Sequence, residues 1–304
     1  MKNKAGRLRS KDTRAVFFAV LAAALYAINS PLSKLMLEKI PAAMMAALLY
    51  LGAGTGLFVT GVIQKKMGKG QKELPLTKKE LPYTAAMVIL DIGAPIFLML
   101  GLTRTTAANA SLLNNFEIVT TSMIALWIFK EAISKRLWAA IGLITLASIL
   151  LSIEDMSSFS FSLGSLFVIL ACVCWGFENN CTRMLSSKNP LQIVVIKGFG
   201  SGSGSLIIAL SAGETVSHAG YLFIALILGF VTYGLSIFFY IYAQRDLGAA
   251  KTSAYYAVAP FIGTALSLMV FQELPSFSFV IALLVMIAGT YFASADNKKD
   301  QGSR

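Results

Sequence analysis

Charged side chains are scarce in this chain of 304 residues. Asp, Glu, Lys and Arg together make up 13% of it, about half of their usual share in soluble domains, whereas apolar residues make up 56%. A soluble fold with this composition would have too few polar side chains to cover its surface. The longest hydrophilic stretch runs only from Gln64 to Leu81, which leaves little chain for a soluble domain. The composition therefore predicts an integral membrane protein.

Histidine and cysteine are also rare. The single histidine, His218, falls in a predicted loop, so the chain has neither a histidine cluster for zinc nor a Ser–His pair inside the membrane. Cys172, Cys174 and Cys181 all fall in one predicted helix, where C-x-C spacing does not fit a zinc site. We therefore expect buried free thiols, no metal and no cofactor.

Long apolar runs define the fold class. A helix needs about 20 mostly apolar residues to cross the hydrocarbon core of a bilayer. The ten predicted spans are residues 15–36, 41–63, 82–102, 106–128, 137–153, 163–184, 190–211, 220–243, 249–271 and 276–294. The expected fold is an all-α integral membrane protein with ten transmembrane helices, in which short loops make neighbouring helices antiparallel.

The basic residues predict the orientation of these spans. The net charge is +11, and 22 of the 26 Lys and Arg fall in alternate segments, beginning with the N-terminal tail. This is the positive-inside pattern, and it predicts a plasma-membrane protein with both termini cytoplasmic. The excess of basic residues thus reflects the orientation of the protein in the membrane. We therefore expect a lipid bilayer, and no nucleic acid, as partner.

The chain also contains an internal repeat. Residues Phe97–Glu131 align without gaps on Phe239–Glu273 at a shift of 142, and the first predicted helix aligns on the sixth at a shift of 149. Glycines at 52, 54 and 56 align with glycines at 200, 202 and 204, a spacing that favours close helix packing over a phosphate loop. Each unit has five helices, an odd number, so the second must enter the membrane from the opposite side.

The repeat predicts the domain organisation. We expect a cytoplasmic N-terminal tail at 1–14, a first repeat at 15–153, an outer linker at 154–162, a second repeat at 163–294 and a cytoplasmic C-terminal tail at 295–304. Inverted five-helix repeats are typical of transporters, in which two halves form two gates. The sequence thus favours transport.

The motifs of the repeat resemble those of a known family. Trp175-Gly176 lies early in the second unit, and each fourth helix ends in a Phe-x-Glu motif, Phe129-Lys130-Glu131 and Phe271-Gln272-Glu273. This arrangement resembles the EamA family of the drug/metabolite transporter superfamily over nearly the whole chain, although Tyr26-Ala27 stands where Trp-Gly is commoner in the first unit. The resemblance implies a ten-helix fold with a central cavity, often exporting amino acids or related metabolites.

Four ionisable residues fall well inside predicted spans: Asp91, Glu117, Glu178 and Lys197. Each costs about 2.5–3.5 kcal/mol on insertion scales, so such groups usually face a cavity or a partner. Glu178 and Lys197 are predicted at similar depth and could form an ion pair, either a structural one or one that a substrate or proton competes for. Asn114 and Glu117 share a polar face that either lines the substrate path or bonds neighbouring helices.

Matching polar positions and aromatic residues complete the candidate site. Asn29 is the repeat counterpart of Glu178 and lies two residues before Pro31, which is expected to kink the first predicted helix. Interrupted helices at matching positions point to a binding site. Trp175, Tyr233 and Tyr256 could shape a pocket, and Tyr233 aligns with Asp91. The predicted substrate-binding residues are Asn29, Asp91, Asn114, Glu117, Trp175, Glu178, Lys197, Tyr233 and Tyr256.

These observations favour a secondary transporter that works by alternating access, and an exporter of small metabolites such as amino acids. A channel or a receptor-like binding protein is the alternative. An intramembrane enzyme ranks last, because Asp91 is the only Asp in a span and an aspartyl protease needs two. The expected partners are a small-molecule substrate and the bilayer. Proton coupling, and the choice between monomer and homodimer, stay open.

Overall fold

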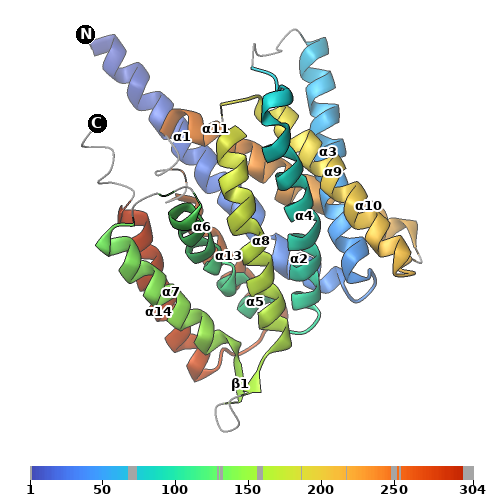
Figure 1. Cartoon of the computed structure of the whole chain (residues 1–304), viewed down its shortest axis with the longest axis vertical. Coiled ribbons are helices and arrows are strands. Elements are labelled where there is room, and N and C mark those ends of the chain that lie inside the picture. The colour runs from blue at the N-terminus through green and yellow to red at the C-terminus, as the bar shows by residue number, and fades with distance from the viewer. Residues whose placement is uncertain are drawn as a thin grey trace.

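The computed structural model describes residues 2–67, 74–128, 130, 133–155, 160–185, 187–216, 218–247, 252 and 255–296. Outside these residues lie 156–159 of the expected outer linker, 297–304 of the expected C-terminal tail, and Phe129 and Glu131 of the first Phe-x-Glu motif. The described part is a bundle of helices with one short hairpin (Figure 1).

The described residues form seventeen elements. The first half contains α1 (Lys2–Ala27), α2 (Asn29–Met36), α3 (Ala42–Lys66), the 3₁₀ turn η1 (Lys78–Glu80), α4 (Leu81–Leu102), α5 (Ala107–Leu113), α6 (Phe116–Trp127) and α7 (Lys135–Ser152). The antiparallel strands β1 (Ile153–Asp155) and β2 (Ser160–Phe161) connect the halves. The second half contains α8 (Leu163–Leu185), α9 (Pro190–Ser211), α10 (Ala219–Gly229), the π-helical η2 (Phe230–Leu235), α11 (Ser236–Leu247), α13 (Ala259–Phe271) and α14 (Phe277–Asp296).

Polar residues in the loops begin several of these helices. The hydroxyl of Thr106 accepts the N–H of Asn109 at 3.1 Å, and Ser134 does the same for Leu137 at 3.1 Å. The side chain of Asn189 accepts the N–H of Leu191 at 3.0 Å at the start of α9. These caps satisfy backbone donors that no residue of the helix itself can accept.

Seven helical stretches in the described residues are long and apolar enough to cross a membrane, and they match seven of the ten predicted spans. Of the other three, 106–128 is divided between α5 and α6, and 249–271 and 276–294 contain the shorter apolar helices Ala259–Phe271 and Phe277–Ala293. The chain is therefore a helical membrane protein, as predicted, while the count of ten spans stays a prediction.

The distribution of side chains is the reverse of that in a soluble protein. Large apolar side chains lie on the surface, among them Ile89, Ile207 and Phe223, each about 65% exposed. Ionisable side chains lie inside, where Asp91 is fully buried and Lys197 is 6% exposed. Extended apolar surface of this kind needs a membrane to cover it.

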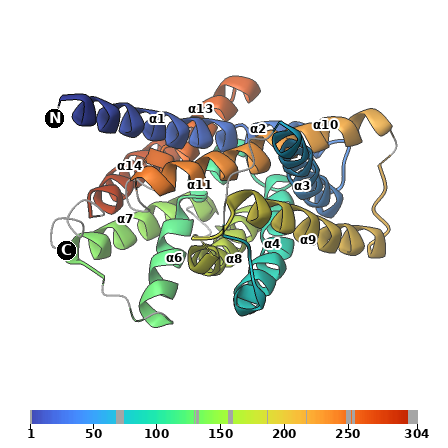
Figure 2. The ribbon, with the colours of Figure 1, turned by 90° about the horizontal axis from the view of Figure 1, so that it is seen from above.

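The helices pack in pairs that join the two halves of the chain. In Figure 1, α7 and α14 lie side by side at one edge, α3 packs along α9 towards the opposite edge, and α4 packs along α8 and α5 along α13 between them. The view from above shows α1 beside α11 (Figure 2). The N-terminal end of α1 and the C-terminal end of α14 lie on the side opposite to the β1–β2 hairpin (Figure 1). Every pair thus contains one helix from each half.

Glycines allow α3 and α9 to approach each other closely. A Cβ atom on Gly198 would overlap the backbone of Gly54, and a Cβ on Gly54 would lie 2.9 Å from the backbone nitrogen of Phe199. A Cβ on Gly52 would overlap the backbone carbonyl group of Leu226 in α10. Gly52 and Gly54, two of the glycines aligned in the repeat, therefore pack helix against helix, as their spacing indicated.

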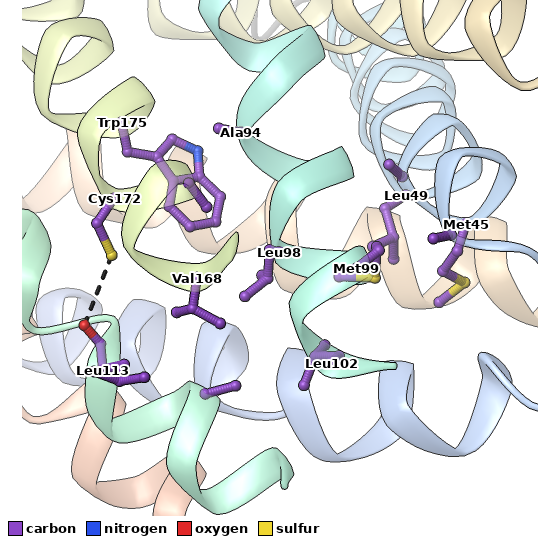
Figure 3. Close-up of a cluster of buried hydrophobic side chains, with 14 of the residues drawn as sticks. Met45, Leu49, Ala94, Leu98, Met99, Leu102, Leu113, Val168, Cys172 and Trp175 are labelled. Carbon is purple, nitrogen blue, oxygen red and sulfur yellow. Dashed lines mark hydrogen bonds between the residues drawn. The ribbon is translucent and has the colours of Figure 1, made fainter. Parts of the chain in front are cut away.

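The apolar core surrounds α4. Leu98 and Met99 of α4 are fully buried, between Leu49 of α3 and Val168 of α8 (Figure 3). Trp175 of α8 also packs into this core and is 6% exposed. These contacts fix α4 and α8 beside each other, and both helices carry charged residues farther along.

One backbone feature occurs twice at equivalent places. Lys130 and Gln272, the middle residues of the two Phe-x-Glu motifs, have φ angles of 57° and 54°, and among the described residues they are the only non-glycine residues with positive φ. Gln272 follows the last residue of α13, where a left-handed residue commonly ends a helix. The motif thus marks a helix end in both halves.

Candidate functional site

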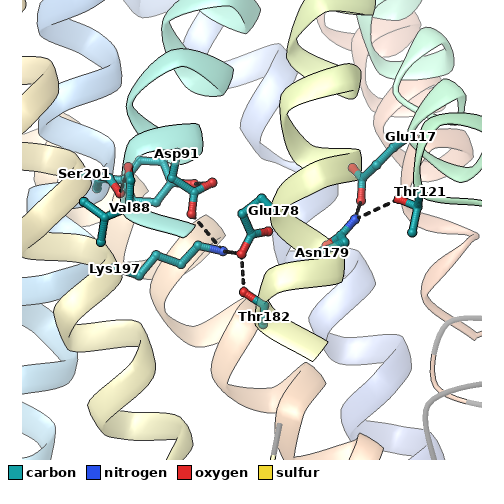
Figure 4. A network of polar contacts seen from close by, with 10 residues as sticks. Val88, Asp91, Glu117, Thr121, Glu178, Asn179, Thr182, Lys197 and Ser201 are labelled. Atoms are coloured by element: carbon teal, nitrogen blue, oxygen red, sulfur yellow. Dashed lines mark hydrogen bonds and ion pairs between the residues drawn. The ribbon is translucent and has the colours of Figure 1, made fainter. Parts of the chain in front are cut away.

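A buried cluster of charged residues joins α4, α8 and α9. The ammonium nitrogen of Lys197 lies 3.0 Å from Oδ2 of Asp91 and 2.9 Å from Oε1 of Glu178 (Figure 4). The hydroxyl of Tyr50, from α3, donates to Oδ1 of Asp91 at 2.9 Å, and the hydroxyl of Thr182 donates to Glu178. When all three charged groups are ionised, this Asp91–Lys197–Glu178 cluster carries one negative charge in excess.

The fourth ionisable residue, Glu117, lies on the other side of α8. Its Oε1 accepts a hydrogen bond of 2.5 Å from the side-chain amide of Asn179, which also lies 3.3 Å from the hydroxyl of Thr121. Successive residues of a helix point about 100° apart. For this reason Glu178 faces the charged cluster while Asn179 faces α6 (Figure 4). One turn of α8 thus holds both polar groups in place.

A tyrosine cluster lies next to the charged groups. The ring of Tyr233, in η2, lies 4.9 Å from that of Tyr50 and 6.0 Å from that of Tyr26 in α1. Tyr26 is in turn 6.0 Å from Tyr256, and the side-chain amide of Asn29 donates to the hydroxyl of Tyr233 at 3.4 Å. Tilted and edge-on ring pairs at these distances are favourable. Both halves of the chain supply these rings.

Two stacked phenylalanine pairs follow the repeat alignment. Phe18 of α1 stacks on Phe239 of α11 with ring centres 5.2 Å apart, and Phe97 of α4 stacks on Phe167 of α8 at 6.2 Å. The alignment places Phe18 on Phe167 and Phe97 on Phe239. The same contact therefore forms twice, once between α1 and α11 and once between α8 and α4, which the alignment matches to them.

Three stretches next to these side chains depart from regular α-helix. The first predicted span is interrupted at Ile28, directly before Asn29 and Pro31, and η2 inserts a π-helical segment that carries Tyr233. The fourth is interrupted at Asn114–Asn115, between α5 and α6. Departures of this kind are frequent at functional sites. The sequence predicted a kink at Pro31, but it gave no signal for η2.

A cavity of about 620 Å³ lies at the end of the bundle with the hairpin, on the side predicted to face outward. Lys34, Arg104, Asn109 and Glu273 supply polar groups to its wall, and Ala108 also lines it. Asp91 is 12 residues before Thr103 at this end of α4, or about 18 Å along the helix axis. This cavity is therefore separate from the charged cluster.

Most of the predicted residues come together. Asp91, Glu178 and Lys197 form one cluster, in which the predicted ion pair between Glu178 and Lys197 is present. Asn29, Tyr233 and Tyr256 belong to the tyrosine cluster, with the hydroxyl of Tyr256 lying 3.4 Å from that of Ser236. Trp175 lies in the apolar core around α4, in the same hydrophobic cluster as Tyr50 and Tyr233.

Sequence reasoning missed two residues of this region. Tyr50 bonds Asp91, yet in the sequence it is one aromatic residue in an apolar span with nothing to mark it. Asn179 bonds Glu117, and here a signal existed, because Asn179 and Asn180 form an adjacent polar pair within a predicted span.

Comparisons with known proteins agree with the helical fold. The model of the EamA-like transporter family matches residues 13–153 and 162–295. A protein of Methanothermobacter thermautotrophicus named an uncharacterized transporter is 26% identical over 288 residues, which cover 90% of this chain and 83% of that protein. The uncharacterized transporter YyaM of Bacillus subtilis is 22% identical over 228 residues, or 72% of this chain and 75% of YyaM. A protein of known crystal structure has the same fold, with a TM-score of 0.66 over 95% of this chain and 99% of that chain at 16% identity.

Proposed function

Since this chain belongs to the EamA-like transporter family of the drug/metabolite transporter superfamily, we propose that it is a secondary transporter that exports small metabolites such as amino acids by alternating access. The family and the apolar helices make it a multi-pass membrane transporter. The direction, the substrate class and the mechanism are the proposal, together with a plasma-membrane location in which both termini are cytoplasmic. Transport across the membrane, and not catalysis, is the proposed activity.

The observation that carries the proposal is the concentration of polar groups at the centre of an apolar bundle. Asp91, Glu178 and Lys197 are each at most 6% exposed, and Glu117 lies across α8 from them. Burying such groups is costly in a membrane and is characteristic of substrate or ion pathways. We propose that the substrate passes between this region and the tyrosine cluster.

The pairing of helices supports alternating access. Exchanging the first five predicted spans with the second five converts the pair α4–α8 into α11–α1, and it leaves the pairs α3–α9, α5–α13 and α7–α14 unchanged. This is the relation expected of two inverted repeats, which rock against each other about a fixed site. The tight glycine contact between α3 and α9 lies on the axis of that exchange and would act as the pivot.

The excess negative charge supports coupling to a cation. Two carboxylates face one ammonium group in the Asp91–Lys197–Glu178 cluster, and the hydroxyl of Tyr50 also faces Asp91. A net charge held in a low-dielectric interior favours uptake of a neutralising cation. We propose that a proton supplies that charge during the transport cycle.

The test is transport by the purified protein in liposomes, guided by thermal stability measured with amino acids, amines, nucleosides, sugar phosphates and carboxylates. A ligand at 100 times its dissociation constant should stabilise the protein by about 2.7 kcal/mol. We expect a saturable stability shift for one chemical class, and saturable flux of that class. Flux that rises linearly with concentration, or conductance without ligand, would instead support the channel alternative.

A further inference from the structure

The break between α5 and α6 leaves two buried oxygen atoms without a hydrogen-bond partner among the described residues. They are Oγ of Ser111 and Oδ1 of Asn114, in side chains that are 2% and 7% exposed. Buried polar atoms in proteins are nearly always hydrogen-bonded, and leaving one unpaired costs about 1–3 kcal/mol. Two such atoms one turn apart indicate that a ligand supplies the missing partners.

Together with the carboxylate of Glu117, the oxygen atoms of Ser111 and Asn114 form a row of acceptors along α5 and α6. Ser111, Asn114 and Glu117 follow at intervals of three residues, and residues at this spacing are neighbours on one side of a helix. Nδ2 of Asn179 is bound to Oε1 of Glu117 and leaves the second carboxylate oxygen for another donor. The row therefore offers a hydroxyl, an amide oxygen and a carboxylate, which together accept several hydrogen bonds and carry negative charge.

The chemistry complementary to this row is a primary ammonium group. An ammonium group has three N–H donors, no acceptor and one positive charge. A hydroxyl or amide ligand could satisfy the oxygen atoms but would leave the charge of Glu117 unbalanced, and a carboxylate would be repelled by it. The three acceptors thus match the three donors of R–NH₃⁺.

Aromatic rings next to the row favour a cation as well. Tyr26 and Tyr256 lie within electrostatic range of Glu117, and their ring centres are 6.0 Å apart. The faces of aromatic rings attract cations within about 6 Å. Rings of this kind near Glu117 would therefore favour a positively charged substrate over a neutral or anionic one.

The outward cavity leads towards the same place. Ala108 lines the cavity and is three residues, or about 4.5 Å along the helix, from Ser111. Leu268 lines it from α13, in which Gly263 packs against Ser111. The cavity lining is thus about one turn from Ser111 along α5, and about one and a half turns from the residue that packs on Ser111 along α13.

We propose that Ser111, Asn114 and Glu117 bind the primary ammonium group of the substrate, so that the protein transports amines, either simple amines or the α-amino group of amino acids. This inference rests on the proposed transport function and names its substrate class. It also separates two roles, because the ammonium group binds at Ser111, Asn114 and Glu117, and the Asp91–Lys197–Glu178 cluster takes up the proton proposed above.

The test compares ligands that differ only in the amino group. Thermal stability of the purified protein is measured with leucine, 3-methylbutylamine and putrescine, and with 4-methylpentanoate, 3-methylbutanol and 1,4-butanediol, which lack the amino group. The same comparison is then made for any other class that liposome flux identifies. We expect saturable shifts only with amines. A stability shift with leucine but not with 3-methylbutylamine would identify amino acids as the substrates. A shift with both compounds would identify amines in general.

Variants of the row test whether the amine binds there. Ser111→Ala and Asn114→Leu each remove one acceptor, so we expect amine affinity to fall about 10- to 100-fold, the loss for one hydrogen bond to a charged group. The protein without ligand should be as stable as the parent or more stable, because an unpaired buried oxygen is removed. Asn114→Asp keeps an oxygen acceptor and should retain amine binding. Ser148→Ala is the matched control, since Ser148 is equally buried but its hydroxyl bonds Ile144 at 2.8 Å.

Each outcome decides the question. If the saturable ligand lacks an amino group, or if Ser111→Ala and Asn114→Leu bind amines like the parent, the row binds no ammonium group, although the protein is still a transporter. Loss of stability in both variants without ligand would show that the oxygens bond structural water, and it would also overturn the inference. The absence of saturable flux for every class tested would instead refute the proposed function.

Discussion

Asn29 donates from its side-chain amide to the hydroxyl of Tyr233 at 3.4 Å, and the repeat alignment places these two residues on Glu178 and Asp91. Equivalent positions in the two halves therefore make equivalent contacts with different chemistry. One half has a single neutral hydrogen bond, whereas the other has two carboxylates joined by Lys197. Separating the second contact needs more energy, so the two gates of an inverted-repeat transporter would open with unequal ease.

We expect Lys197→Met to destabilise the protein by about 3–5 kcal/mol, because it leaves two buried carboxylates without their cation. Thermal unfolding in detergent measures this. Adding Asp91→Asn and Glu178→Gln to the variant should restore most of the lost stability. Lys188→Met is the control, since Lys188 pairs with Glu80 at the surface at 3.2 Å, where ion pairs contribute about 0–1 kcal/mol.

Tyr50→Phe should cost more stability than Tyr233→Phe. The hydroxyl of Tyr50 bonds a charged carboxylate at 2.9 Å, a contact of about 1.5–3 kcal/mol, whereas the hydroxyl of Tyr233 accepts from a neutral amide at 3.4 Å, worth about 0.5–1.5 kcal/mol. The two rings are similarly buried, so the substitutions remove the same atom from matched surroundings. Equal losses in thermal unfolding would contradict the role of Tyr50 in holding Asp91.

Gly198→Ala should destabilise the protein by about 1–3 kcal/mol or more, because the new methyl group overlaps the backbone of Gly54 and α3 and α9 must separate. The same substitution at Gly142 is a control with the opposite sign. No atom of the described residues lies within 4 Å of a Cβ there, so replacing a helical glycine should stabilise by about 0.5–1 kcal/mol. If both variants unfold alike, the close helix contact is not tight.

Glu117→Gln should abolish saturable transport in liposomes while the protein still folds and inserts. The substitution keeps the shape of the side chain and a hydrogen-bond acceptor for Asn179, so packing is preserved and only the negative charge is lost. Glu38→Gln, at an exposed position near the outer end of the first predicted span, should transport like the parent. Normal transport by Glu117→Gln would mean that this polar face only joins α6 to α8.

Membrane orientation can be tested with single cysteines in a variant that lacks Cys172, Cys174 and Cys181. A cysteine at Glu38 should react with a membrane-impermeant maleimide from outside intact cells, and a cysteine at Met67 should react only after permeabilisation. Both positions are exposed at helix ends, and the basic residues predict opposite sides for them. Labelling of both from the same side would overturn the predicted topology.

Length and hydropathy alone were sufficient to predict much of the fold. Apolar stretches of about 20 residues must form helices in a bilayer, since only a helix satisfies its own backbone there. Seven predicted spans coincide with long apolar helices for this reason. The breaks at Ile28 and at Asn114–Asn115, and the π-helical η2, were less accessible, because they depend on contacts with neighbouring helices.

The candidate site was likewise predictable from the sequence only in part. The sequence by itself determined that Asp91, Glu178 and Lys197 are buried, because a charge inside an apolar span has to avoid lipid. It could not determine that Lys197 joins two carboxylates, that Tyr50 bonds Asp91, or that Ser111 and Asn114 are left without partners. Those facts depend on how residues far apart in the sequence, such as Asp91 and Lys197, are brought together by packing of α3, α4, α5, α8 and α9, and only the tertiary structure decides that packing.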